Sequence, residues 1–264
     1  MQPDPVTIPF AGDSGAWHDL LARSAAGRRA DGLVGPLAAL YGPILDGAAA
    51  GGHVVAHLGQ SLDGRIALPD GQSTYITGRD DAAHNHRLRA LCDAVIVGAR
   101  TVDSDDPRLT VRLVDGDSPV RVVIDPNRRL SPELGIFVDG AAPSLLVCTV
   151  DAAAGAAQHG AAEIIALPPR DDGGLAPQAI IAALAARGLT SLFIEGGGAT
   201  VSRFVEAGLV DRLQLTIAPI LLGEGHPVLM LPPIARIDEA ARVTTRIYVL
   251  GDDLLYDCVL DGRR

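Results

Sequence analysis

The residues best suited to chemistry lie in the segment 193–203, where an apolar run ends at Glu195 and the glycines Gly196, Gly197 and Gly198. A strand that turns through glycines into a helix aims free backbone N–H groups and the positive helix end at one point, which suits a phosphate. A carboxylate at the end of a strand also lies where open α/β sheets bind ligands. A glycine turn that binds nothing has the same pattern, so this segment alone leaves phosphate binding open.

A second polar segment, residues 97–112, follows another apolar run that ends at Gly98. Its hydroxyl, carboxylate and Arg groups, on what we expect to be a loop, suit a site that holds sugar hydroxyls and phosphate together. By itself the segment fits a solvated loop with a turn at Asp105-Asp106-Pro107 better. A third segment, 58–77, contains the turn signal Asp63-Gly64.

The remaining reactive residue types give no site. His84 and His86 are two residues apart and cannot face one metal ion from a helix, whereas His53 and His57 flank an apolar run without a carboxylate or Cys partner. The three Cys residues are scattered, which indicates a reducing compartment and neither a disulfide framework nor a zinc site. We therefore expect no metal.

Composition narrows the function further. The 264 residues are 48% hydrophobic but only 3% aromatic, and the net charge is -10. Few aromatic residues and an acidic balance argue against nucleic-acid binding. We find no signal-peptide pattern in residues 1–13 and no apolar stretch long enough to span a membrane, so we expect a cytoplasmic protein without membrane contact.

Strand and helix patterns alternate from residue 53 onward. We expect strands over 54–58, 94–98, 120–124, 144–148, 164–167 and 191–194, and helices over 80–91, 176–186 and 199–207. Crossover connections of this length imply a mainly parallel α/β sheet flanked by helices. The runs 212–218 and 247–260 predict closing antiparallel edge strands, and residues 1–50 predict a helical N-terminal extension that packs on the main domain or on a partner subunit.

In this order, the segments resemble the reductase domain of riboflavin biosynthesis, the C-terminal half of a bifunctional pyrimidine deaminase–reductase. The resemblance spans roughly residues 53–260 and rests on the blocks 61–64, 75–77, 86–90, 93–98, 101–112, 119–125, 194–197, 208–211 and 217–223. It implies a dihydrofolate-reductase-like fold, a reductase domain over 51–264, and NADPH-dependent reduction of the ribose of a 5-amino-6-(5-phosphoribosylamino)uracil-type substrate to a ribitylamino product. The zinc-binding deaminase motifs do not occur in this sequence.

The resemblance also implies site residues. The cofactor would contact Gly59, Tyr75, Gly98, Thr101, Asp105, Gly196, Gly197, Gly198, Ala199, Thr200 and Arg203. The small phosphorylated substrate would contact Ser73, Arg89, Arg108, Arg112 and Glu195. Arg89 and Arg112 can clamp a phosphate bidentately in an otherwise acidic protein.

The expected reaction moves a hydride to the sugar carbon that carries the amino substituent, after the ring has opened to an imine-like form. The catalytic candidates are Glu195, which would bind the pyrimidine N–H groups, and Asp63 or Asp105 as proton donor. Pro126 follows Asp125 where a hydroxyl residue is common in the family, so we expect Arg128 or Arg129 to approach the adenosine 2′-phosphate.

Two other functions fit the sequence less well. One is an NADPH-dependent reductase of a pterin, a dihydrofolate-like compound or another heterocycle, which has no need for Arg89 and Arg112 together. The other is a catalytically silent nucleotide-binding partner, against which the set of Thr101, Asp105 and Glu195 argues. Family resemblance further implies a homodimer.

Overall fold

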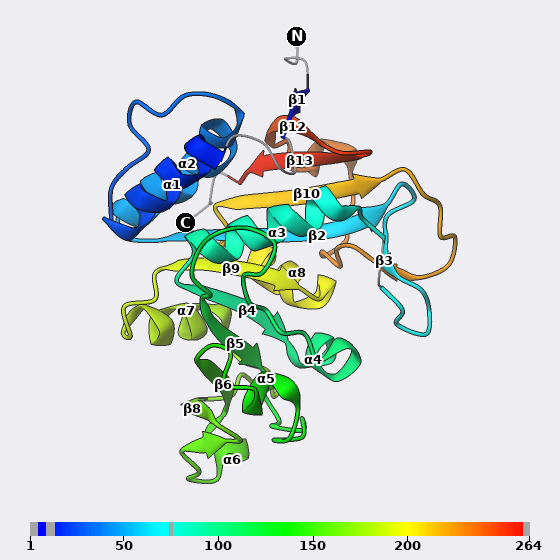
Figure 1. Ribbon diagram of the computed structural model, residues 1–264. Helices are drawn as coiled ribbons and strands as arrows, with labels where there is room; N and C mark the ends of the chain where they lie inside the picture. Colours follow the sequence, from blue (N-terminus) through cyan, green and yellow to red (C-terminus); the bar gives the residue numbers. More distant parts are fainter. Residues whose placement is uncertain (1–4, 9–13, 74–75, 261–264) are drawn as a thin grey trace.

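The computed structural model describes residues 5–8, 14–73 and 76–260, and its centre is a twisted sheet of eleven strands (Figure 1). In spatial order the strands are β1 (Val6–Thr7), β12 (Thr244–Leu250), β13 (Asp253–Val259), β10 (Arg212–Ala218), β2 (His53–Ser61), β9 (Ser191–Gly196), β4 (Ala94–Gly98), β5 (Val120–Ile124), β6 (Ser144–Thr149), β8 (Ala162–Leu167) and β7 (Gln158–His159). From β10 to β8 in this order, each pair of adjacent strands is parallel. β13, β12 and β7 add antiparallel pairs at the edges. The predicted fold class is confirmed.

Helices cover both faces of this sheet. They are α1 (Ser14–Ala25), α2 (Pro36–Ala49), α3 (Arg79–Leu91), α4 (Ala99–Asp105), α5 (Gly135–Val138), α6 (Val150–Ala153), α7 (Pro177–Ala185) and α8 (Gly198–Glu206). A two-stranded sheet of β3 (Arg65–Ala67) and β11 (His226–Pro227) lies beside them, and a short 3₁₀ turn spans Ile237–Glu239.

The central strands are apolar on both sides because each face is covered. In β4, Val95 and Val97 pack into the core under α1 to α6, while Ala94 and Ile96 pack into the core under α7 and α8. This alternation follows from the period of two in a strand and explains why β4, buried along most of its length, reads as a continuous apolar run.

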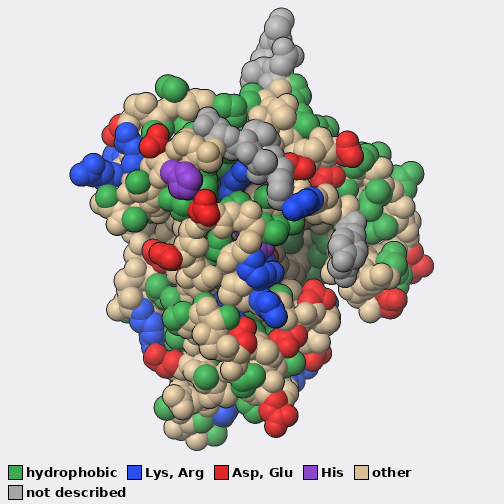
Figure 2. Space-filling model, in the orientation of Figure 1, with side chains coloured by type: hydrophobic (Ala, Val, Ile, Leu, Met, Phe, Trp, Pro, Cys, Tyr) green, Lys and Arg blue, Asp and Glu red, His purple; other side chains and the backbone are tan. Residues whose placement is uncertain are grey.

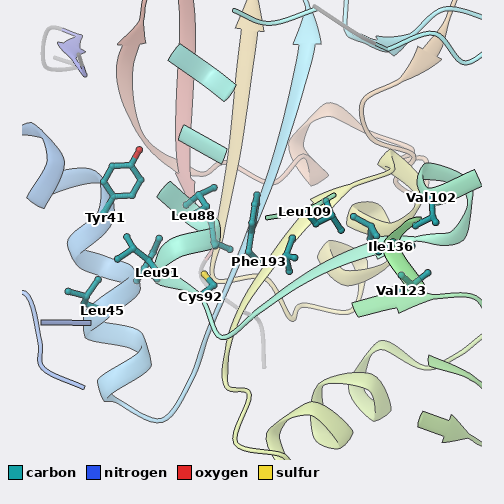
Figure 3. Packing of buried hydrophobic residues seen from close by; sticks show 14 of the residues in the cluster. Tyr41, Leu45, Leu88, Leu91, Cys92, Val102, Leu109, Val123, Ile136 and Phe193 are labelled. Atoms are coloured by element: carbon teal, nitrogen blue, oxygen red, sulfur yellow. The ribbon is translucent and has the colours of Figure 1, made fainter. Parts of the chain in front are cut away.

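The first fifty residues are built into the same core. Tyr41 and Leu45 of α2 belong to one buried cluster with Leu88 and Leu91 of α3 and with Phe193 of β9 (Figure 3). β1 adds a parallel pair to β12 at the sheet edge. Of the two expected positions of the extension, the structure has it on the main domain.

Three details differ from the sequence-based expectations. The segment after Gly98 is not a loop at first but the two-turn helix α4, since Val102 is buried in the core. The run 247–260 is a hairpin, β12 and β13, because Gly251 adopts a positive φ of 64° and reverses the chain. β10 is antiparallel only to β13 and runs parallel to β2. No helix of the described residues is long and apolar enough to cross a membrane.

Candidate functional site

The carboxyl ends of β2, β4 and β9 open onto a cleft of about 520 Å³. Its lining includes twelve of the seventeen predicted site residues: Gly59, Ser73, Gly98, Thr101, Asp105, Glu195, Gly196, Gly197, Gly198, Ala199, Thr200 and Arg203. Figure 2 shows Arg side chains in the middle of one face, beside a hollow whose rim also carries carboxylates. A concave site with a few convergent polar groups is the usual form of a small-molecule site.

Two glycines let β4, β9 and α8 approach each other at the cleft. A Cβ on Gly98 would lie 2.4 Å from Oγ1 of Thr200, and Gly197 has a φ of +76° with the place of its Cβ 3.1 Å from Oγ1 of Thr101. A side chain at either position would collide with these Thr hydroxyls. The two glycines therefore allow the strand ends and the start of α8 to pack closely beside the cleft.

The first turn of α8 points a helix N-terminus into this space. Gly197 caps the helix without a side-chain hydrogen bond, and Ala199, Thr200 and Arg203 line the cleft. The backbone N–H groups of the first turn, the helix dipole and the Arg203 guanidinium all attract negative charge. This corner favours an anionic group.

α4 presents a second polar edge. Thr101 and Asp105 are four residues apart on this helix and both line the cleft, where Ser73 joins them. Burial raises the pKa of the Asp105 carboxyl, and an interaction with the Ser73 hydroxyl opposes the rise. Asp105 can thus hold a proton at higher pH than an exposed aspartate.

Glu195 is paired with Arg89 across the gap between β9 and α3. Nε of Arg89 donates to Oε2 of Glu195 at 2.7 Å, a second N–H of the guanidinium donates to the other oxygen, and the remaining end donates to the carbonyl of Thr110 at 2.8 Å. Both side chains are largely buried. The guanidinium of Arg89 is therefore a fixed part of the site rather than a free clamp.

Arg108 and Arg112 complete a cationic cluster with Arg89. Burial and then the charges of Arg89 and Arg108 lower the pKa of Arg112, which Glu195 only partly offsets. The Arg112 guanidinium donates to Oγ1 of Thr110 at 2.5 Å. The three guanidiniums near Glu195 place positive charge next to the cleft, although none of the three is among its lining residues.

Asp63 lies away from the cleft lining. Its carboxylate accepts hydrogen bonds from the Ser61 hydroxyl at 2.6 Å and from the backbone N–H groups of Leu222 and Gly223 at 3.1 and 2.6 Å. These bonds lower its pKa to about 2. This carboxylate ties the β2–β3 turn to the segment after β10, and the geometry favours Asp105 over it as a proton donor. Tyr75 lies outside the described residues.

The sequence-based expectations missed several cleft residues: His57, Asp81, Asn85 and His226. Arg129, one of the two Arg residues expected near the adenosine 2′-phosphate, also lines the cleft. His57 has a carboxylate partner after all, because Asp81 of α3 lies 3.0 Å from its Nε2. The four-residue spacing of Asp81, Asn85 and Arg89 would have placed all three on one helix face. Among the described residues, no group of three or more His, Cys, Asp or Glu side chains could hold a metal ion.

Comparison with known proteins agrees with this geometry. The family model of the RibD C-terminal domain matches residues 52–253. The 2,5-diamino-6-ribosylamino-4(3H)-pyrimidinone 5′-phosphate reductase of Methanothermobacter thermautotrophicus is 34% identical over 220 residues, which are 80% of this chain and 99% of that protein. The riboflavin biosynthesis protein RibD of Aquifex aeolicus is 31% identical over 199 residues, and the match covers 74% of this chain and 54% of that one.

Solved structures share the fold. RibD from Acinetobacter baumannii has a TM-score of 0.69 at 24% identity, covering 84% of this chain and 62% of that chain. The Rib7 reductase of Saccharomyces cerevisiae has a TM-score of 0.62 at 20% identity, covering 79% of this chain and 90% of that chain. The chain thus spans about half the length of the RibD relative from Aquifex and nearly all of the archaeal reductase. It belongs to the RibD C-terminal domain family.

Proposed function

We propose that the protein is an NADPH-dependent reductase that converts the ribose of a 5-amino-6-(5-phosphoribosylamino)pyrimidine to the ribityl group, a step of riboflavin biosynthesis. The observation that carries this proposal is the cluster of Arg89, Arg108 and Arg112 around Glu195, beside a glycine-lined cleft. The cluster supplies the charge that a sugar phosphate needs, and the names of the relatives point to the same substrate class.

The residues present fit a nicotinamide dinucleotide. The N-terminus of α8, which Gly98 and Gly197 allow to pack closely against the strand ends, suits the pyrophosphate, and the hydroxyls of Thr101 and Thr200 suit a neighbouring ribose. When bound, the cofactor supplies the hydride. The protein orients the acceptor carbon toward it and holds a proton nearby, because reduction of a C=N bond consumes one hydride and one proton.

The proposal is tested by NADPH oxidation, followed as absorbance at 340 nm, with 5-amino-6-ribosylaminouracil phosphate as acceptor. We expect substrate-dependent turnover in the native protein and a large rise of KM in Arg112→Ala, because Arg112 adds to the positive charge beside the cleft. The non-deaminated pyrimidine and dihydropterins serve as alternative acceptors. Turnover of a dihydropterin alone would replace the proposed substrate, and tight NADPH binding without any turnover would favour the silent partner.

Arg129 is our candidate for the adenosine 2′-phosphate, since it lines the cleft. Arg128 points elsewhere and donates to His159, Ala153 and Gln158. We expect Arg129→Gln to raise KM for NADPH about tenfold, because the variant loses roughly one charge-assisted hydrogen bond to the 2′-phosphate. KM for NADH should not change, because NADH lacks this phosphate. Arg128→Gln is the matched control, and an equal loss in both variants would remove Arg129 from this role.

We also propose that the protein acts in the cytoplasm as a homodimer, as in the family. Several large apolar side chains are exposed in the segment between β10 and β12, namely Leu221, Met230, Leu231, Ile234 and Ile237, which supports contact with a second copy. Light scattering that gives the mass of one 27.3 kDa chain would contradict the dimer.

A further inference from the structure

Three polar residues of the cleft have no part in the site described so far. His57 comes from β2, and Asp81 and Asn85 come from one face of α3. His57 and Asp81 are only 2% and 1% exposed, so they line the innermost part of the cleft. Buried ionisable groups in a cleft need a physical reason for their retention there.

The hydrogen bonds around His57 fix which ring nitrogen carries a hydrogen. The hydroxyl of Thr216 donates to Oδ1 of Asp81 at 2.6 Å, and Nε2 of His57 lies 3.0 Å from both Oδ1 of Asp81 and Oγ1 of Thr216. The Asp81 carboxylate carries no hydrogen, and the Thr216 hydroxyl already donates its hydrogen to that carboxylate. Nε2 of His57 must therefore be the donor. Nδ1 is then the atom of the ring at which a proton is gained or lost.

The carboxylate partner stays charged. Burial alone would raise the pKa of Asp81, but the neighbouring rings of His57 and His84 and the Thr216 hydroxyl outweigh burial and hold the pKa below its usual range. The pair thus resembles the orienting carboxylate and histidine of other proton-transferring sites.

The next histidine is held neutral. The Tyr41 hydroxyl bonds Nδ1 of His84 at 2.7 Å, and Nε2 of His84 donates to Oε1 of Gln214 at 2.9 Å. Burial, and then the adjacent His57, lowers the pKa of His84 to about 3. The two rings meet edge to face with centroids 5.1 Å apart. His84 therefore supports the ring of His57 without competing for its proton.

The side-chain oxygen of Asn85 indicates that a polar ligand binds at this end of the cleft. Its Oδ1 is buried and accepts no hydrogen bond from a described residue. A buried amide oxygen without a partner is costly, and an N–H group of a bound molecule would satisfy it. Asn85 lies one helical turn from Asp81, so that N–H group would lie near His57.

We propose that His57 is a catalytic residue that protonates the substrate from Nδ1 during reduction, with Asp81 as its positioning residue. The inference rests on the proposed function. The hydride forms the new C–H bond at the sugar carbon, the C=N π electrons pass to nitrogen, and the proton leaves Nδ1 of His57 to form the new N–H bond. The nicotinamide is oxidised by two electrons, the substrate is reduced by two, and the neutral imidazole recovers its proton from water.

The kinetic test uses His57→Gln, which can still donate toward Asp81 but carries no exchangeable acid. We expect the single-turnover rate of NADPH oxidation to fall about 10²- to 10⁴-fold, the usual worth of general acid catalysis, with the Kd of NADPH within threefold of native. The matched control is His53→Gln, because His53 lies on the same strand, is also buried and faces a carboxylate, that of Asp211 at 3.7 Å, but lies outside the cleft lining. Equal rate losses in both variants would overturn the proposal.

Asp81→Asn tests the positioning role. Because Asp81 acts through His57, the double variant Asp81→Asn/His57→Gln should be no slower than His57→Gln alone. A purely structural Asp81 would give additive losses together with a lower Tm. Additive losses would therefore refute the pairing.

A measurement without turnover separates this inference from the proposed function. In protein labelled with ¹⁵N-histidine, long-range ¹H–¹⁵N correlation spectra at one pH report the hydrogen on each ring nitrogen. We expect a hydrogen on Nε2 of His57 and a shift of its Nδ1 resonance on saturation with NADP⁺, while His84 does not change. An unmoved Nδ1 resonance would overturn the inference even if the pyrimidine is reduced, and a shifted one would support it even if another acceptor is the substrate.

Discussion

Replacing Glu195 by Gln is expected to lower kcat/KM about 10²- to 10³-fold and to destabilise the protein by about 3–5 kcal/mol. The carboxylate forms a two-bond ion pair with Arg89, and both side chains are 14% exposed or less. The substitution keeps the shape but leaves the buried Arg89 guanidinium without its anion. The freed guanidinium would also repel Arg112, whose pKa its charge already lowers.

Steady-state kinetics and urea unfolding at pH 7.5 check this expectation. The control is Glu163→Gln, because Glu163 pairs with Arg187 at 2.7 Å but is 60% exposed. An exposed pair contributes about 0–1 kcal/mol, so this variant should match the native protein. A Glu195→Gln protein with native stability and native KM would show that the ion pair does not organise the site.

Acid is expected to destabilise the fold from about pH 6.5 downward, the range in which an unfolded histidine gains its proton. Burial lowers the pKa of His84 to about 3, whereas an unfolded histidine titrates near pH 6.5. Between these pH values the unfolded chain binds more protons than the folded one, so the free energy of unfolding falls as pH falls from about 6.5 toward 3. The slope is roughly 1.4 kcal/mol per pH unit for each histidine of this kind.

Urea unfolding at pH 7.5, 6.5, 5.5 and 4.5 measures this slope. His84→Gln keeps polar atoms for Tyr41 and Gln214 and should reduce the slope below pH 6.5 by roughly one proton. His86, whose pKa burial lowers to about 4, adds to the slope in the native protein and in His84→Gln alike. A His84→Gln protein with the native slope would refute the prediction.

The parts of the fold that follow local patterns could be predicted from the sequence. The run 94–98 is apolar on both faces, and 120–124 is so apart from Arg121. The chain between them is too long for a hairpin, which leaves a parallel pair as the simplest arrangement. The hairpin at Gly251 was not predicted, although Gly251-Asp252 between the two apolar stretches is a turn signal. α4 was missed because seven residues rich in polar groups carry little helical pattern.

The candidate site also contains residues that could be predicted from the sequence and pairings that could not. Glycines and Glu195 at strand ends could be predicted because the carboxyl ends of parallel strands meet at one edge. The pairing of His57 with Asp81 and of Arg89 with Glu195 could not, because each joins residues from different elements at a distance that only the packed sheet and helix determine. Arg89 in particular was expected to be free for phosphate, whereas its guanidinium already has a carboxylate and a carbonyl.

The hydrogen bond between Tyr41 of α2 and His84 of α3 shows that the folded core extends beyond the segment that the family model matches. The family match begins at residue 52, yet Tyr41 closes a buried polar chain that runs through His84 to Gln214, and Leu40 and Ile44 are completely buried. A fragment that begins at residue 52 would expose the apolar surface of α3 that α2 covers, and His84 would lose its hydrogen bond to Tyr41. The start of the family match is therefore not a boundary at which this protein could be divided into two folded parts.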